Sequence, residues 1–352
     1  MKRSLRRRLR KLGASDSEID NAVRGRYVSL LTLDRAILPG ARTYTMQQVA
    51  VAAGTDLAAA RAVWRAIGFP DIPDDVTAFT DSDLRTLRAF MKRFDDPWII
   101  DWSMERALSQ ARVASSSLAR VADSIVDEVA RARRTAHDAG LTDEQLAETV
   151  ADHADFEGLA RLIEHVYRLQ LRAAMWRRLA GNEPSAPGTV DGAVGFADLV
   201  GYTALAEELD DDGLAALVQH FVDVAHDTVT AAGGRIVKTI GDEVMFVTDT
   251  VPTAALIAVQ LTERSTGDEL LPETRAGVAS GRLVAREGDY FGPVVNLASR
   301  LTELARPGTV LAPSELGAEL EHDGRFVVRR APSRRVRDIG RVELCTIRRG
   351  DA

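Results

Sequence analysis

Residues 235 to 243 read RIVKTIGDE, and residues 244 to 247 continue as VMFV. Polar and apolar residues alternate here and many side chains are β-branched, which predicts one strand before the Gly-Asp pair and another after it. Glycine accepts the positive φ of a tight turn, so the two strands should form a hairpin. Asp242 would then present its carboxylate at the hairpin tip, four residues beyond Lys238. A lone Gly-Asp pair is most often a plain turn, so any function of Asp242 depends on the rest of the chain.

The composition is that of a globular protein with room for two domains. The chain has 352 residues, of which 45% are hydrophobic and 28% charged. A single cysteine, Cys345, excludes an intrachain disulfide and suits a reducing compartment, so we expect a cytoplasmic protein. No apolar run approaches about 18 residues, so no transmembrane segment is expected. The net charge of −7 argues against a protein dedicated to nucleic acid.

The chain begins with a basic run, KRSLRRRLRK at residues 2 to 11. No apolar stretch follows it, which is unlike a secretory signal. A solvated chain end and contact with an acidic surface, either lipid headgroups or an acidic region of this protein, are both compatible with the run.

Residues 1–180 have the pattern of an all-helical domain. Apolar residues recur every three or four positions, as at Leu118, Val121 and Ile125, and a longer amphipathic segment runs from Leu159 to about Leu179. Residues 181–190 contain GNEPSAPG, a short linker rich in proline, glycine and small polar residues. Residues 191–352 then form the second predicted domain.

One part of the helical half, residues 44–94, resembles a MerR-type helix-turn-helix. Residues 47–53 would form the first helix, Gly54 the turn, and residues 56–67 the second helix. A recognition helix presents Arg, Lys, Asn or Gln to base edges, and this one offers only Arg61 and Arg65 among alanines. A structural or regulatory module is therefore favoured over DNA binding.

The second half alternates strands and helices. Helices are expected at about 213–231, 252–266 and 293–305. Strands are expected at 193–199, 235–240, 243–247, 274–280, 309–311, 326–330 and 342–347, with one more strand between 280 and about 287. The order β-α-β-β-α-β with additions predicts a ferredoxin-like α+β fold.

Three motifs in this half belong together: FADLVGYT at 196–203, KTIGDE at 238–243 and DYFGPVVNLASR at 289–300. In this order and spacing they resemble the catalytic domain of class III adenylate cyclases, over roughly residues 190 to 348. The helical first half more loosely resembles the regulatory domain of soluble actinobacterial cyclases, some of which are autoinhibited and pH-responsive.

Asp198 and Asp242 are the candidate metal ligands. One ends a strand and the other lies on a hairpin tip, so both carboxylates can reach one site. Mg²⁺ prefers one or two carboxylates with water and substrate phosphate, and two ions about 4 Å apart can serve the attacking and leaving oxygens. The resemblance implies two Mg²⁺ or Mn²⁺ ions per site and adds Leu199 to their ligands. The backbone from Leu199 through Gly201, Tyr202 and Thr203 would offer N–H groups to the phosphates.

Lys238 and Asp289 are interpreted as the base-selecting pair. Adenine presents an acceptor at N1 and a donor at its amino group, which match a lysine and an aspartate, whereas guanine reverses both roles. Such a polar mismatch can discriminate by about 10⁴-fold. The alternative is a surface ion pair worth under about 1 kcal/mol.

Asn296 and Arg300 lie one helical turn apart and share a face. The resemblance assigns the ribose to Asn296 and the charge developing on the α-phosphate to Arg300. It also implies a cation from the last hairpin near the triphosphate. Arg337 occupies that position, where the family usually has lysine.

The implied reaction is attack of the ribose 3′-hydroxyl on the α-phosphorus of ATP, giving 3′,5′-cyclic AMP and pyrophosphate. In this family the metal-binding aspartates come from one chain and the other catalytic residues from its partner. One chain carries both sets here, so a homodimer with two equivalent sites is expected.

Two alternatives remain open from the sequence: a non-catalytic sensing or dimerisation module of the same fold, and a MerR-like DNA-binding regulator. The regulatory stimulus is also open. His137, His153 and His165 lie in the helical half and could titrate near neutral pH, and an apolar ligand between the helices is equally compatible.

Overall fold

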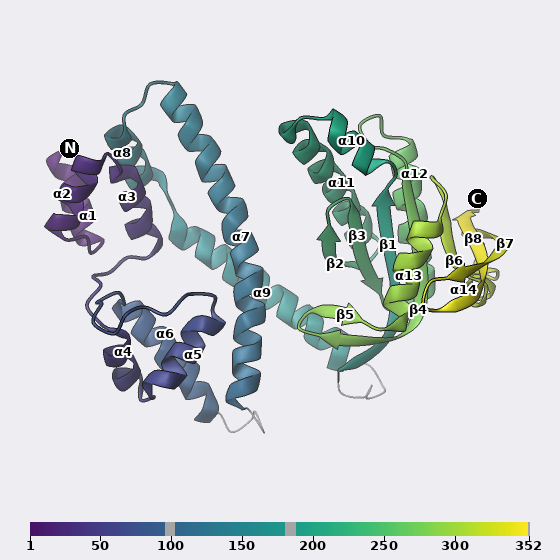
Figure 1. Cartoon of the computed structure of the whole chain (residues 1–352), viewed down its shortest axis with the longest axis horizontal. Helices are drawn as coiled ribbons and strands as arrows, with labels where there is room; N and C mark the ends of the chain where they lie inside the picture. The colour runs from purple at the N-terminus through teal and green to yellow at the C-terminus, as the bar shows by residue number, and fades with distance from the viewer. Residues whose placement is uncertain (96–102, 180–187, 351–352) are drawn as a thin grey trace. The chain divides into compact units, whose positions relative to one another are not determined.

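The computed structural model describes residues 1–95, 103–179 and 188–350. The chain divides into two compact units, Met1–Gly181 and Asn182–Ala352. The first is helical, apart from one β-bridge between Tyr44 and Phe79, and the second combines helices with one large sheet (Figure 1). An all-helical region followed by an α+β region confirms the predicted fold class. None of the helices in the described residues has the length and apolar character needed to cross a membrane.

The helices of the first unit are α1 (Arg3–Lys11), α2 (Asp16–Gly25), α3 (Val28–Ile37), α4 (Met46–Ala53), α5 (Leu57–Ala66), α6 (Asp81–Lys92), the short 3₁₀ helix η1 (Arg93–Asp95), α7 (Met104–Asp138), α8 (Asp143–His153) and α9 (Phe156–Leu179). Residues 96–102, within the range assigned to the helical domain, lie outside the described part of the chain.

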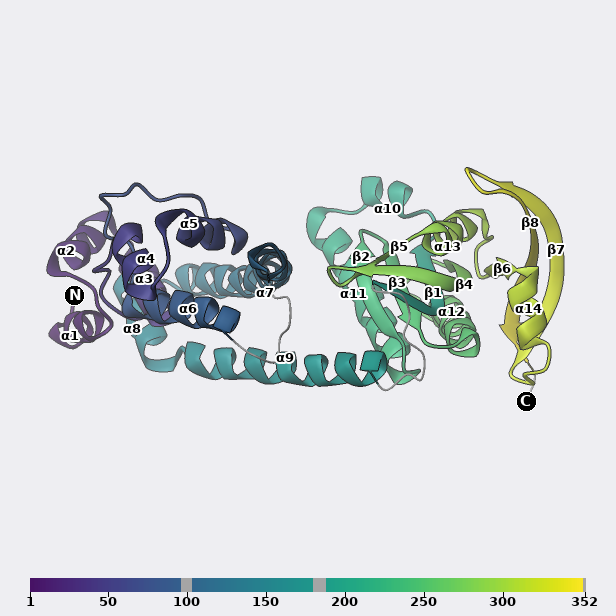
Figure 2. The same ribbon diagram turned by 90° about the horizontal axis from the view of Figure 1, so that it is seen from below.

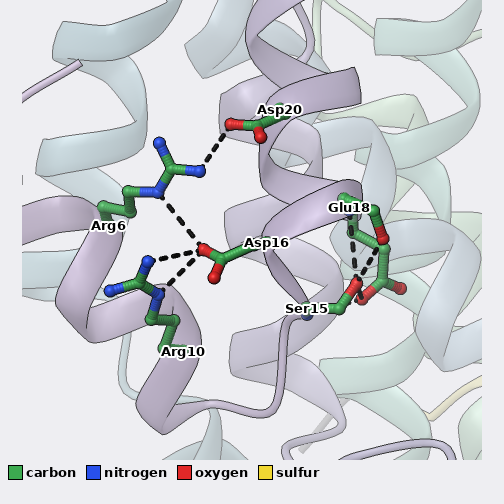
Figure 3. Close-up of polar contacts among 7 residues, drawn as sticks. Arg6, Arg10, Ser15, Asp16, Glu18 and Asp20 are labelled. Atoms are coloured by element: carbon green, nitrogen blue, oxygen red, sulfur yellow. Dashed lines mark hydrogen bonds and ion pairs between the residues drawn. The ribbon is translucent and has the colours of Figure 1, made fainter.

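The basic run at the chain start forms α1 and contacts acids of its own unit. Arg6 lies 2.5 Å from Asp20, and Arg10 lies 2.6 Å from Asp16, both on α2 (Figure 3). Lys2 lies 2.7 Å from Glu148 on α8. These pairs are exposed, so each contributes little to stability on its own. The acidic surface that this run contacts is therefore part of the same helical unit.

Helices α4 and α5 form the helix-turn-helix within residues 44–94. Thr45 caps α4 through its hydroxyl, Gly54 ends it at φ +77°, and Asp56 caps α5. These are the local signals that start and stop helices. Arg61 pairs with Asp74, and Arg65 lies 2.8 Å from Asp71. Both cations of the second helix are thus neutralised locally, which does not favour phosphate binding.

The two longest helices leave apolar side chains exposed in the single chain. Leu118 on α7 is 50% exposed, and Trp176 on α9 is 70% exposed. The apolar periodicity that predicted these helices is present, but described residues of this chain do not bury the whole of either face.

The second unit contains eight strands and five helices in its described residues. They are β1 (Thr189–Leu199), α10 (Tyr202–Glu208), α11 (Asp211–Ala231), β2 (Arg235–Ile240), β3 (Glu243–Thr248), α12 (Val251–Thr266), β4 (Thr274–Arg286), β5 (Asp289–Phe291), α13 (Pro293–Leu304), β6 (Val310–Pro313), α14 (Ser314–Leu320), β7 (Phe326–Val336) and β8 (Gly340–Arg349).

These strands form one sheet in the order β2-β3-β1-β4-β6-β8-β7, with β5 paired to β4. β4 runs antiparallel to β1 along the whole length of β1, from Thr189 opposite Val284 to Leu199 opposite Thr274. The sequence predicted two strands between residues 274 and 287, and this is wrong. Gly281 takes φ +143° inside a single continuous strand, because the long ladder with β1 holds both halves together.

Helices cover both faces of the sheet (Figure 2). Helices α11, α12 and α14 share one apolar cluster with the sheet, which includes Phe221, Phe246 and Ile257. Helix α13 packs on the other face, where Val295 and Ala298 belong to a second cluster. A Cβ on Gly277 of β4 would lie 2.4 Å from the Ala298 carbonyl oxygen, so only glycine allows this close approach. This packing fixes α13 against the strands that carry the candidate site.

Candidate active site

Asp198 lies at the end of β1 between two charged neighbours. It is opposite Glu243 of β3 on one side and Arg275 of β4 on the other. The Nε and Nη2 atoms of Arg275 donate to Asp198 Oδ2 over 2.8 and 2.5 Å. The Asp198 side chain is only 15% exposed, so this two-point contact fixes its orientation.

Asp242 lies at the β2–β3 turn beside this pair. Gly241 precedes it at φ +61°, as the predicted tight turn requires, and the Asp242 carbonyl oxygen accepts from the Leu199 N–H over 3.2 Å. Burial and the neighbouring Asp198 raise the pKa of the Asp242 carboxyl. The two predicted metal ligands therefore meet at one place, although one belongs to a strand end and the other to a hairpin.

Glu243 adds a third acid. Burial, with the negative charges of Asp198 and Asp242, raises the pKa of Glu243 to about 7. Arg275 is the cation whose charge acts on this cluster, so acids exceed bases there. An excess of partly buried carboxylate favours a bound cation, because a cation removes the repulsion that raises these pKa values.

The donor set fits Mg²⁺ or Mn²⁺ with substrate and water completing the coordination. Oxygen ligands are the type that these hard ions prefer, and one or two carboxylates suffice when phosphate and water supply the rest. Within the described residues, no three His, Cys, Asp or Glu side chains come together as a ready metal-binding group. The acids alone therefore do not make a closed structural metal site.

Lys238 and Asp289 meet at the edge of the sheet. Lys238 Nζ, on β2, lies 2.6 Å from Asp289 Oδ2, on β5, and both side chains are about one-third exposed. Asp289 Oδ1 accepts the Tyr290 N–H over 2.7 Å, which leaves the carboxylate held at two points. The two residues are 51 positions apart in the chain, so the fold brings them together.

Asn296 and Arg300 lie on α13, as predicted. Asn296 is exposed, and Arg300 Nη1 lies 2.6 Å from Glu303 Oε1 on the same helix. The Glu303 carbonyl oxygen accepts from Arg275 Nη1 over 3.1 Å. No hydrogen bond or ion pair of the described residues joins Asn296 or Arg300 to the Lys238–Asp289 pair.

The predicted phosphate contacts lie on two separate segments. Gly201 takes φ +78° and Tyr202 and Thr203 begin α10, directly after β1. Arg337 lies in the β7–β8 turn, where its side chain is 79% exposed and 3.5 Å from Asp338. The structure does not bring Arg337 into contact with residues 201–203 of the same chain.

Comparison with known proteins gives two family matches. Residues 2–175 match the adenylate cyclase regulatory domain, and residues 188–346 match the adenylate and guanylate cyclase catalytic domain. An adenylate cyclase of Glutamicibacter nicotianae is 33% identical over 92% of this chain and 83% of its own length. The chain belongs to the adenylate cyclase family.

Two further proteins are similar to this adenylate cyclase. A pH-sensitive adenylate cyclase of Mycobacterium tuberculosis is 32% identical over 91% of this chain and 82% of its own length. The crystal structure of an adenylyl cyclase from P. aeruginosa is 25% identical, with a TM-score of 0.39, over 46% of this chain and 96% of that one. The two family matches and the two similar cyclase sequences confirm the predicted resemblance to class III adenylate cyclases.

Sequence reasoning missed Arg275 and Glu243 of this cyclase. Arg275 lies in TRAGVAS, where a charged residue interrupts a strand of small and apolar residues, and that interruption was the available signal. Glu243 adjoins Asp242 and was interpreted only as the start of a strand. Both become visible as candidate site residues once the register of β1 with β3 and β4 is known.

Proposed function

We propose that this adenylate cyclase converts ATP to 3′,5′-cyclic AMP and pyrophosphate at sites shared between two copies of the chain, under control of its helical unit. The observation that carries the choice of substrate is the contact of 2.6 Å between Lys238 and Asp289. It holds a donor and an acceptor side by side in a partly exposed position, which is the arrangement that the adenine edge requires.

The base-selecting pair acts by matching hydrogen-bond polarity. Lys238 donates to adenine N1 and Asp289 accepts from the amino group. With guanine the lysine would face the N1–H donor and the aspartate would face the carbonyl oxygen. Two polar groups that each face their own kind once the base covers them cost enough to discriminate by orders of magnitude.

Asp198 and Asp242 would hold the divalent cations, with the Leu199 backbone beside them. A bound Mg²⁺ or Mn²⁺ would supply Lewis acidity toward the ribose 3′-oxygen and the phosphate oxygens. Arg275 fixes the direction of the Asp198 carboxylate and leaves Oδ1 without a contact to that guanidinium. Asp198 and Asp242 would therefore bind the cations, and Arg275 would orient the Asp198 carboxylate.

The remaining groups would hold the ribose and triphosphate of ATP. The Asn296 amide would orient the ribose, and Arg300 would stabilise negative charge that develops on the α-phosphate. Backbone N–H groups of Gly201, Tyr202 and Thr203, with Arg337, would contact the outer phosphates. In one chain these groups lie on separate segments, which favours a site completed by a partner.

A homodimer supplies both halves of the site twice. The C2 arrangement is self-complementary, so each copy would give its aspartates to one site and its base-selecting residues to the other. The similarity to a pH-sensitive cyclase over 91% of this chain supports pH-responsive control by the helical unit. An apolar ligand between its helices is a second candidate stimulus, and the single cysteine supports a cytoplasmic location.

The direct test is a cyclase assay on the full-length protein with ATP or GTP and Mg²⁺ or Mn²⁺. We expect cyclic AMP from ATP, little cyclic GMP from GTP, and loss of product in Asp242→Ala protein. Absence of cyclic AMP with either metal would instead support the non-catalytic alternative. A salt-dependent gel shift tests the DNA-binding alternative, and no shift at low salt would remove it.

A further inference from the structure

A second contact joins the two strands that carry the base-selecting pair. Arg235 of β2 donates from Nη2 to the Tyr290 hydroxyl of β5 over 2.8 Å, and its guanidinium carbon lies 5.3 Å from the centre of the Tyr290 ring. Both side chains are half-buried. Arg235 forms no ion pair with a described residue, so its charge is used on the tyrosine, through a hydrogen bond and a cation–π contact.

The direction of the Arg235 side chain depends on an irregularity in β2. Arg235 lies opposite Val247 of β3 and Lys238 lies opposite Met245, so Val237 is the extra residue of a β-bulge. In a regular strand, side chains alternate between the two faces, and residues three apart point to opposite sides. The bulge removes this offset, as bulges next to active sites commonly do. Arg235 and Lys238 therefore lie on the same face of the sheet.

That face is the one on which β5 lies. Met245 and Val247 belong to the apolar cluster against which Tyr290 packs. Residues directly opposite each other in an antiparallel pair have their side chains on the same face, so the two cations of β2 lie on this side as well. They contact adjacent residues of β5, one through the Tyr290 hydroxyl and the other through the carboxylate just before it in the chain.

Strand β5 is weakly held by its own backbone. It has three residues, and among the described strands it pairs with β4, opposite residues 284–286. The turn before it is tight, since Glu287 and Gly288 both take positive φ. The ladder between β1 and β4 begins at Val284, so most of this hairpin extends beyond β1. A three-residue strand offers few ladder hydrogen bonds, so side-chain contacts to β2 restrict its position.

We infer that Arg235 and Tyr290 are positioning residues for base selection, and that their contact sets the spacing of Lys238 and Asp289 that adenine requires. This inference rests on the proposed function and deepens it, because it adds two residues that act on the choice of base through the pair. Tyr290 acts at two points. Its N–H donates to Asp289 Oδ1 over 2.7 Å, and its hydroxyl is held by the strand that carries Lys238.

The inference predicts a change in selectivity rather than a general loss of activity. Recognition by matched hydrogen bonds requires the donor and the acceptor to be held within about 0.5 Å of the productive geometry. Without the Arg235–Tyr290 contact, β5 can shift and the match to adenine weakens. Guanine does not match the pair in either state, so its use should change little. A residue that only stabilised the fold would affect both nucleotides equally.

Single substitutions in full-length protein test this directly. Tyr290→Phe removes the hydroxyl and keeps the ring, and Arg235→Met removes the donor and keeps much of the stem. In each variant we expect the kcat/KM preference for ATP over GTP to shrink by about fivefold. Arg235→Lys keeps a donor and a charge, so it should retain most of the preference. Arg282→Met, the same change at an exposed position on β4, is the matched control and should leave the preference unchanged.

The double variant tests whether the two residues act through one contact. If they do, Tyr290→Phe combined with Arg235→Met should have the preference of either single variant, because the first change already removes the contact. Independent effects would multiply to a loss of about 25-fold. Calorimetric binding of 3′-deoxy-ATP and 3′-deoxy-GTP with Mn²⁺ measures the same preference without turnover, because both nucleotides lack the attacking hydroxyl.

An unchanged preference in Tyr290→Phe and Arg235→Met protein would overturn the inference. So would equal losses for the two nucleotides, or effects that multiply in the double variant. The binding measurement lets the two proposals fail separately. Wild-type protein that prefers 3′-deoxy-ATP but forms no cyclic AMP from ATP contradicts the proposed function alone. Cyclic AMP formation with a preference that these variants do not alter contradicts the positioning role alone.

Discussion

Lys238 Nζ and Asp289 Oδ2 lie 2.6 Å apart, although the two residues belong to different strands and are 51 positions apart in the chain. Without nucleotide, the Lys238 ammonium and the Asp289 carboxylate serve as each other's hydrogen-bond partner. The same two groups match the adenine edge, so substrate binding would exchange this ion pair for hydrogen bonds to the base. Since an exposed ion pair is worth at most about 1 kcal/mol, the exchange costs little.

The first prediction concerns base selection. Asp289→Asn replaces a carboxylate, which only accepts hydrogen bonds, with an amide that can also donate one. The amide can donate to the carbonyl oxygen of guanine, which the carboxylate repels. We expect kcat/KM for ATP to fall by about 100-fold and the preference for ATP over GTP to shrink by at least about tenfold. Steady-state kinetics with both nucleotides measures this. An unchanged ratio would mean that Asp289 only forms a surface ion pair.

The second prediction concerns Arg275. Arg275→Met leaves the largely buried Asp198 without its partner beside Asp242 and Glu243. We expect the metal-free protein to lose about 1–3 kcal/mol of unfolding free energy, and saturating Mn²⁺ to restore more stability than it adds to wild type. Thermal or urea unfolding with and without Mn²⁺ measures both quantities.

A matched control lies on the same strand. Arg282 of β4 is 72% exposed and 3.9 Å from Asp191, so Arg282→Met should change stability by less than about 0.5 kcal/mol. An equal loss of unfolding free energy in the two variants would show that the contact of Arg275 with Asp198 stabilises the protein no more than an exposed ion pair does.

The third prediction concerns the pH dependence of stability in metal-free protein. The Glu243 pKa is raised from 4.5 to about 7, so between these values the folded state binds more protons than the unfolded state. The unfolding free energy should therefore decrease as pH rises through this window and change no further from this group above it. Glu243→Gln should remove that decrease, as urea titrations at several pH values would reveal.

Glu319→Gln, at an exposed position on α14, is the control and should keep the wild-type slope. Retention of the full slope in Glu243→Gln protein would show that Glu243 is not the titrating group.

The fourth prediction concerns the helical unit. If it restrains the catalytic copies, the isolated residues 185–352 should form cyclic AMP faster than the full chain, by a ratio that changes between about pH 5.5 and about pH 8. Equal rates at every pH would remove the inhibitory role.

Local sequence patterns were sufficient for the hairpin at 235–248 and for the helices α11 and α12. In the structure Gly241 forms the turn, Asp210 caps α11 and Thr250 caps α12, so each element is fixed by residues next to it in the chain. The family resemblance is also carried by short motifs, which is why it could be recognised without a structure.

The contact of Arg275 with Asp198 could not be predicted in this way. The two residues are 77 positions apart, and their meeting depends on the register of β1 with β4. Local patterns do not specify which residues of two distant strands lie opposite each other. The proposed roles of Asn296 and Arg300 require a second copy of the chain, so these roles stay predictions.

The shared site is tested most directly by mixing two inactive variants, Asp242→Ala and Arg300→Ala. Each homodimer lacks one essential group in both of its sites. In a mixed dimer, one site receives both defects and the other receives Asp242 from one copy and Arg300 from its partner. Random exchange of equal amounts makes half of the dimers mixed, so about one quarter of the wild-type cyclic AMP rate should return. A mixture that stays as inactive as its two components, although subunit exchange is verified, would contradict the shared site.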